Sequence, residues 1–420
     1  MQGDFKLPRT KKYRPHPKPK PTEHQAEPEP QPDFVIDEAE LQAPHKPPKQ
    51  RKVLVAPHKH FIRFWRWWLS LSKNERFAII GVSLLIFGVF SILWFAFVQP
   101  ESSPQISISK NAKPKPKAPI TVASPLTGVQ VAPELANRPV TGIMIENSVY
   151  ARPQSGLQDA GVVVEAIAEG GITRFMALFQ DASPQHIGPV RSLRPYYIDF
   201  AAPFQASIVH VGGSPDALSR VRNGGYRDLD QFFNSGYFHR VNYRDAPHNV
   251  YTSFDRLDAL NKAKGYTSSS FTIWPRKADK KLVTPTAKTI NVQISSPDYY
   301  SHYDYDAATN TYSRSEGGAP HMELVSATDK TGVRIHPKVV IALVMAYSIA
   351  ADGQHSVYAD SGSGTAFVFQ DGEVIQGTWS KANSGSQIQF SDSAGAPLKL
   401  NAGQTWLTLV AAANKVSYAP

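Results

Sequence analysis

The sequence predicts an α+β protein in which an N-terminal disordered tail and one transmembrane helix precede an α/β-type domain and then a mainly β domain. Three observations lead to this order. Residues 1–76 are rich in proline and basic residues, and residues 77–98 carry no charge. From residue 125 onwards, short apolar runs alternate with turn residues.

The tail has a composition that cannot form a core. Residues 14–21 alternate proline with basic residues or histidine, which favours an extended polyproline II chain. Residues 1–119 contain 20 Lys+Arg and 10 Asp+Glu, and residues 120–420 contain 25 of each, so the whole net charge of +10 lies before residue 120. Because this basic excess lies beside a membrane segment, we expect anionic lipid, and not nucleic acid, as its partner.

Residues 77–98 predict a membrane-spanning helix. Twenty-two uncharged residues make a helix of about 33 Å, enough for a hydrocarbon core of about 30 Å. The preceding residues 61–69 mix aromatic and basic side chains, as is typical of a membrane interface. The basic residues upstream place the N-terminus in the cytoplasm and the folded part outside the cell. Residues 99–124 form a Lys/Pro-rich linker that we expect to be stiff and extended.

The first folded segment, residues 125–275, alternates predicted strands with predicted helices. Apolar runs predict strands at residues 141–145, 162–167, 174–179 and 207–211. Helices are expected at residues 194–204, 215–222 and 253–264. Pro215 suits a first helical turn, Ser253 is a capping residue, and Gly224 and Gly265 end two of the helices.

The second folded segment, residues 285–418, is predicted to be mainly β. Its apolar runs are residues 289–294, 339–347, 365–369, 374–378 and 406–411. Asp371-Gly372 predicts a hairpin turn between two of them. This pattern favours one antiparallel sheet with a helix against it.

Several kinds of chemistry are excluded or lack a motif. The chain has no cysteine, which excludes disulfides, thiolate nucleophiles and cysteine-ligated metals. The sequence has no G-x-S-x-G, S-x-x-K, H-E-x-x-H or P-loop motif. The spacing of the histidines does not indicate a metal site, and we expect neither a metal nor a cofactor.

Four polar, glycine-flanked clusters follow predicted strands, at residues 168–174, 188–194, 210–215 and 244–252. The candidate ligand-binding residues are Arg174, Arg191, Ser192, Arg194, His210, Gly212, Gly213, Ser214, Arg244, His248 and Asn249. The candidate acids and bases are His210, His248 and Glu169. The third cluster joins a strand to a helix through two glycines and a capping serine, an arrangement that can hold an anion.

Each cluster also has a structural interpretation. Gly-Gly-Ser-Pro is an ordinary turn between a strand and a helix. A buried pair such as Arg174 and Glu169 commonly only holds a domain together. A single histidine at a strand end is more often a structural residue than a catalyst. The case for a binding site therefore depends on several clusters sharing one pocket.

These motifs, taken in order, resemble the YerB-like family of bacterial extracytoplasmic proteins, which is built on a domain of unknown function, 3048, with N- and C-terminal parts. The resemblance runs through residues 125–128, 137–139, 151–157, 169–174, 188–192, 210–215, 246–249, 369–372, 377–379 and 400–406. It implies a location in the cell envelope. Family members are typically lipoproteins anchored through a cysteine, whereas this chain has a helix and no cysteine. The resemblance implies no catalytic mechanism.

Three functions remain open from the sequence. The chain is either an envelope protein that binds an anionic or polar, cell-wall-derived ligand, or a hydrolase or transferase acting on an envelope polymer. The third alternative is a scaffold whose cytoplasmic tail recruits partners. The first is favoured by the clustered arginine, histidine and glycine motifs.

Overall fold

The computed structural model describes residues 59–97 and 119–420, and the side chains of residues 63–94 and 119–420. These residues belong to two compact units, Met1–Asn111 and Ala112–Pro420, which are considered separately. The expected tail up to residue 58 and the expected linker over residues 99–118 lie outside the described residues.

The first unit contains two helices, α1 (Lys59–Ser70) and α2 (Lys73–Phe97). Within residues Lys73–Trp94 of α2, a window of 18 residues has a mean hydropathy of 2.5, and the helix is long and apolar enough to cross a membrane. The expectation of one long apolar helix before the folded body is thus confirmed, whereas that body is mostly β-sheet in both segments. The expectation of disorder over residues 1–76 is wrong for α1, because its aromatic and basic residues recur at helical spacing.

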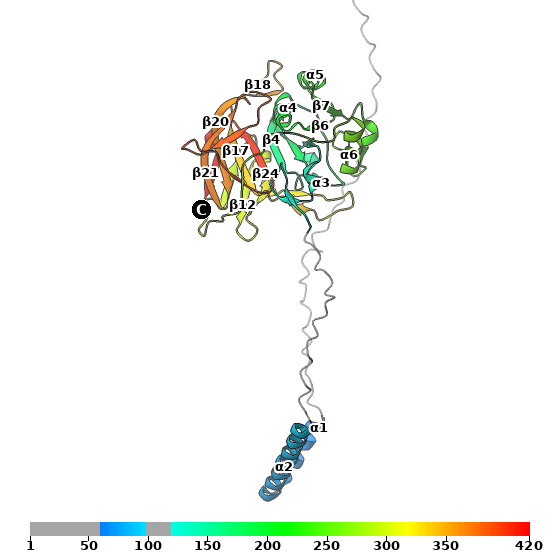
Figure 1. Cartoon of the computed structure of the whole chain (residues 1–420), viewed down its shortest axis with the longest axis vertical. Helices are drawn as coiled ribbons and strands as arrows, with labels where there is room; N and C mark the ends of the chain where they lie inside the picture. The colour runs from blue at the N-terminus through cyan, green and yellow to red at the C-terminus, as the bar shows by residue number, and fades with distance from the viewer. Residues whose placement is uncertain (1–58, 98–118) are drawn as a thin grey trace, which may run out of the picture. The chain divides into compact units, whose positions relative to one another are not determined.

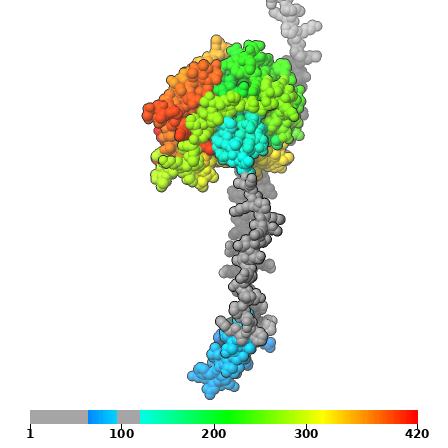
Figure 2. Space-filling view, in the orientation of Figure 1, coloured from blue at the N-terminus to red at the C-terminus, as the bar shows by residue number. Residues whose placement is uncertain are grey.

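A ten-stranded sheet forms the centre of the second unit (Figure 1). Its strands in spatial order are β22 (Gln389–Ser391), β21 (Glu373–Lys381), β20 (Gly362–Gln370), β17 (Val339–Val344), β24 (Thr405–Val410), β4 (Val162–Glu169), β5 (Ile172–Phe179), β3 (Thr141–Glu146), β6 (Ser207–His210) and β7 (Arg227–Asp230). Strand β24 pairs in parallel with both β17 and β4, and so joins the two segments in one sheet. In Figure 2 the surface likewise passes without a break from the cyan and green first segment to the orange and red second segment.

Short helices flank the part of this sheet that the first segment forms. They are α3 (Pro133–Ala136), α4 (Pro195–Ala201), α5 (Pro215–Asn223) and α6 (Phe254–Ala263). Along β3, Met144 packs in the same apolar cluster as α4 and α5, whereas its neighbours Ile143 and Ile145 pack with α6. This alternation places α6 on the opposite face of the sheet. Ser214 caps α5 and Ser253 caps α6, as predicted.

The second segment differs from the single antiparallel sheet that was expected. Five of its strands form a separate antiparallel sheet, β14 (Ala319–Pro320), β13 (Thr311–Glu316), β12 (Ser301–Asp306), β11 (Thr289–Val292) and β25 (Val416–Ala419). Residues 276–420, all described, contain no α-helix. The five-stranded sheet takes the place of the expected helix, because Ile290, Tyr303 and Tyr312 pack against Val340 and Phe369 of the large sheet.

Five two-stranded pairs complete the body. They are β1 (Val122–Ala123) with β2 (Gln130–Val131), β8 (His239–Arg240) with β9 (Val250–Tyr251), β10 (Arg276–Lys277) with β23 (Leu400–Asn401), β15 (Met322–Glu323) with β16 (Val333–Arg334), and β18 (Tyr347–Ile349) with β19 (Ser356–Tyr358). The pair β8–β9 supports the loop of residues 241–249.

Candidate functional site

The candidate site lies where three parallel strands end. Strands β3, β6 and β7 pair in parallel, so their carboxyl ends, Glu146, His210 and Asp230, lie at one edge of the sheet. The segment of residues 188–193 crosses this edge: Glu146 N donates to Pro189 O at 2.9 Å, and Val211 N donates to Arg191 O at 3.1 Å. Ligands of open sheets with parallel strands commonly bind beyond such carboxyl ends.

The predicted anion seat at His210 is filled by the protein itself. His210 has no exposed surface, and its two ring nitrogens lie 2.7 Å from Gly212 O and 2.9 Å from Asp228 Oδ1. The Gly212 amide donates to Asp230 Oδ1 at 3.1 Å. Although burial raises the pKa of Asp228, its hydrogen bond with His210 brings that pKa below the usual value. His210, Gly212, Gly213 and Ser214 therefore connect β6, β7 and α5, and both nitrogens of the histidine are occupied.

A second group of predicted residues forms a charge network. Glu169 accepts a hydrogen bond from Arg174 at 2.9 Å and another from Arg194. Both arginines are buried and also bond to Ser192, Arg174 to its carbonyl oxygen and Arg194 to its hydroxyl. Burial raises the pKa of Glu169, but the two arginines outweigh it and lower that pKa below its usual value. This network joins the β4–β5 turn to the start of α4.

A third group connects Arg191 with His248. The carboxylate of Glu146, which is buried, lies 3.0 Å from His248 Nδ1 and 3.4 Å from Arg191 Nε. Ser148 Oγ lies 3.4 Å from the same histidine nitrogen. His248 keeps 21% of its side chain exposed, in contrast to His210. A buried carboxylate thus orients a histidine whose Nε2 has no hydrogen-bond partner among residues 119–420.

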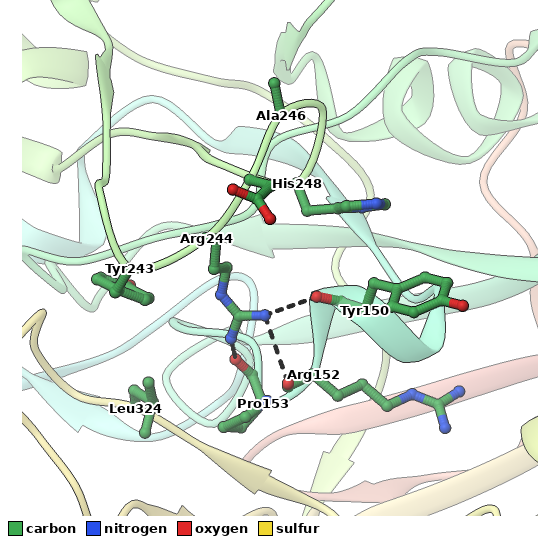
Figure 3. A pocket seen from close by; sticks show the side chains of 9 residues that line it. Tyr150, Arg152, Pro153, Tyr243, Arg244, Ala246, His248 and Leu324 are labelled. Atoms are coloured by element: carbon green, nitrogen blue, oxygen red, sulfur yellow. Dashed lines mark hydrogen bonds between the residues drawn. The ribbon is translucent and has the colours of Figure 1, made fainter. Parts of the chain in front are cut away.

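His248 lines a cavity of about 650 Å³ (Figure 3). The lining residues are Tyr150, Arg152, Pro153, Tyr243, Arg244, Asp245, Ala246, His248 and Leu324. The guanidinium of Arg244 donates to the carbonyl oxygens of Tyr150 at 2.9 Å, Arg152 at 3.3 Å and Pro153. Arg244 thus connects the two walls of the cavity, the loop of residues 241–249 and the turn of residues 149–153.

The cavity is basic and aromatic. Arg244 forms no ion pair with any acidic residue in the described part of the body, because its partners are carbonyl oxygens. Arg152 contributes a second guanidinium, paired with Glu316 at 3.4 Å, and Asp245 contributes one exposed carboxylate. Tyr150 is 75% exposed and Tyr243 is 39% exposed. These side chains can bind an anionic group and stack on a flat or sugar-like ring.

The sequence-predicted residues are therefore divided among three groups. Arg244 and His248 line the cavity. Arg191 does not line it, but pairs with Glu146, whose carboxylate also contacts His248. Asn249 lies outside the lining and accepts a hydrogen bond from Arg240. Residues that the sequence analysis missed are Glu146, Tyr150, Arg152 and Tyr243. For Glu146 a signal exists, since the polar run Glu146-Asn147-Ser148 ends the apolar strand β3.

A closed polar network lies behind the cavity wall. Arg314 donates to Glu165 Oε2 at 2.9 Å and to Glu316 Oε1 at 3.3 Å, and all three side chains are buried. Trp406 of β24 donates to the same Glu165 oxygen at 3.1 Å. His321, also buried, lies 3.0 Å from Gln154 Oε1. Burial and the nearby Arg314 lower the pKa of His321 to about 3. The network joins the two sheets. Both ring nitrogens of His321 have partners inside it, Arg314 and Gln154, and neither is open to solvent.

No group of three or more histidine, aspartate or glutamate side chains is placed to hold a metal ion in residues 59–97 and 119–420. The side chains at the cavity offer two guanidiniums, two phenols, one carboxylate and one oriented imidazole.

Comparison with known proteins places the chain in a family. Residues 126–267 match the N-terminal domain, and residues 290–407 the C-terminal domain, of the protein of unknown function DUF3048. The chain is 31% identical over 296 residues to YerB of Bacillus subtilis (strain 168), which its name describes as a candidate lipoprotein; the match covers 68% of this chain and 86% of YerB. The crystal structure of Bacillus subtilis YerB is similar with a TM-score of 0.63 at 28% identity, covering 71% of this chain and all of that one. This protein therefore belongs to the DUF3048 family, with YerB as a relative.

Proposed function

We propose that this protein is a membrane-tethered envelope protein whose cavity binds an anionic, cell-wall-derived ligand. The observation that carries the proposal is Arg244, a guanidinium without an acidic partner, next to Arg152 and His248 in one cavity of about 650 Å³. A guanidinium whose charge no carboxylate balances attracts a carboxylate or phosphate group.

The aromatic residues support a ring-bearing ligand. Tyr150 and Tyr243 are exposed at the cavity, where a ligand can contact the faces of their rings. A tyrosine face suits the apolar face of a sugar ring, and the arginines suit a carboxylate or phosphate on the same molecule. Charged cell-wall saccharides combine both features.

The test uses the unit of residues 112–420, which has its own apolar cores. Its melting temperature is followed with muropeptides, sugar phosphates and neutral disaccharides. At ten times the dissociation constant, a bound ligand raises it by about 3 °C. We expect this rise with the anionic compounds only, and we expect Tyr150→Ala to abolish it.

Phe233→Ala is the matched control, because Phe233 is 70% exposed, close to the 75% of Tyr150, but lies outside the cavity. Loss of the rise in both variants would point to general destabilisation. A rise with neutral and anionic sugars alike, or with none of the compounds, would contradict an anion-binding cavity.

A second function, hydrolysis or group transfer on an envelope polymer, is favoured by one observation. Glu146 orients His248 through Nδ1 and leaves Nε2 available as a general base. If the protein is such an enzyme, His248→Gln abolishes turnover of a bound polymer and leaves its binding within about threefold. Full turnover in this variant would remove His248 from the reaction.

The location is part of the proposal. We expect α2 to cross the membrane once, with the N-terminus in the cytoplasm and the body outside. Because the chain has no cysteine, one introduced at the exposed Ser393 reports the side of the membrane without other changes. In intact cells an impermeant maleimide should label Ser393→Cys. Labelling only after cell lysis would place the body in the cytoplasm.

A further inference from the structure

Helix α1 is a separate element from the membrane-spanning helix. It ends at Ser70, and Ser72 starts α2 through two reciprocal bonds: Ser72 N donates to Glu75 Oε2 at 2.8 Å, and Glu75 N donates to Ser72 Oγ at 3.4 Å. This is a capping box. Arg76 donates to Leu69 O at 2.7 Å, so its charge lies at the carboxyl end of α1. The break between the helices is therefore held by side chains.

The two sides of α1 differ in character. Arg63, Arg66 and Ser70 follow one another at helical spacings of three and four and form one exposed stripe. Phe64, Trp68 and Leu69 lie on the other side, where Phe64 and Trp68 stack with ring centroids 6.4 Å apart. Phe64 is 53% exposed and Leu69 is 62% exposed. No described residue covers this apolar side.

We propose that α1 lies along the membrane surface, with its apolar side among the lipid head groups and its arginines on the phosphates of anionic lipids. Its position two residues before α2 brings it to the boundary of the bilayer, and tryptophan and arginine are the residues that prefer this zone. Arg63 and Arg66 form no ion pair with a described acidic residue, and the first turn of α1 has none. The inference depends on α2 crossing a membrane, but not on the ligand of the cavity.

The absence of cysteine allows a direct test on the full chain. Leu69→Cys, Ser70→Cys and Gly88→Cys variants are placed singly in nanodiscs, one copy per disc, containing zwitterionic and anionic lipid. The rate of reaction with an impermeant maleimide is measured. Leu69 and Ser70 are neighbours about 100° apart around α1, with Leu69 away from the polar stripe and Ser70 in it, so we expect Leu69→Cys to react about tenfold more slowly than Ser70→Cys.

Each other result has a distinct meaning. Equal rates for Leu69→Cys and Ser70→Cys would overturn the docking of α1. Protection of Leu69→Cys only in discs with two copies would also overturn it, in favour of contact between chains. Gly88 lies inside the apolar span of α2, so labelling of Gly88→Cys would show instead that α2 does not cross the membrane.

A second measurement tests the lipid charge. In the Leu69→Cys background, Arg63→Gln with Arg66→Gln should lower the ratio of docked to undocked α1 by about 30-fold, because each basic residue near an anionic surface contributes about fivefold. The Leu69→Cys rate then approaches that of Ser70→Cys. Discs without anionic lipid should have the same effect. An unchanged rate in both cases would overturn the role of anionic lipid.

Discussion

His210 and His248 stand at comparable places in the sequence but in opposite environments in the structure. Each follows a strand or turn and contacts a carboxylate, Asp228 in one case and Glu146 in the other. His210 is fully buried with both nitrogens occupied, whereas His248 is 21% exposed and has one bonded nitrogen. A histidine–carboxylate contact therefore indicates function only when the second nitrogen can reach a cavity.

The largest effect is expected from His210→Ala. Removing this side chain takes one hydrogen bond from Gly212 O and one from the Asp228 carboxylate and leaves a cavity in a fully buried place, so the free energy of unfolding should fall by about 3 kcal/mol. Urea denaturation of the unit of residues 112–420 measures it. A change below about 1 kcal/mol would mean that His210 is not a structural residue, and the comparison with His248 would lose its basis.

An intermediate effect is expected from pH at the third histidine, His321. Its folded pKa of about 3 lies below the ordinary 6.5, so below pH 6.5 the unfolded chain takes up a proton that the folded chain does not. Stability is therefore lost as the pH falls. Between pH 6.5 and 5 this group should remove about 1.5 kcal/mol from the free energy of unfolding.

The control for this prediction is His321→Gln, which lacks the titrating ring. Its loss of stability between pH 6.5 and 5 should be smaller than that of the wild type by the same amount. Equal losses in the two proteins would mean that His321 takes up its proton in the folded state as easily as in the unfolded one.

The smallest effect on stability is expected from His248→Gln. Glutamine can still donate to Glu146, and the cavity already exposes this side chain, so the free energy of unfolding should change by about 0.5 kcal/mol or less. If the protein is an enzyme, turnover of a bound polymer should nevertheless be lost, while its binding stays within about threefold. If His248→Gln instead destabilises the protein as much as His210→Ala, both histidines are structural.

Much of the body could be predicted because its elements are local. The strand β3 and the helix starts at Ser214 and Ser253 depend on apolar runs and capping residues within a few positions. The pairing of β24 with β4 could not be predicted, because Trp406 and Val163 are far apart in the chain and any apolar strand suits a buried neighbour. The separate five-stranded sheet was missed for the same reason.

The candidate site was predictable in part. Arg244 and His248 were found because polar residues after apolar runs are visible in the sequence. The sequence does not show which of Arg191 and Arg194 lies near the cavity. Arg191 pairs with Glu146 beside the cavity, whereas Arg194 pairs with Glu169 in a closed network. Their partners come from different strands, and only the fold determines which carboxylate each arginine meets.

The place of β24 in the large sheet has a consequence for biogenesis. Its residues Thr405–Val410 are synthesised after every other strand of that sheet, yet they fill the gap between β4 and β17. Until they emerge, β4 exposes an apolar edge with unpaired backbone groups, which invites pairing with other chains. A ribosome that stops before residue 405 thus releases an aggregation-prone product. The ten-stranded sheet therefore closes in one late step, after all of its other strands have been made.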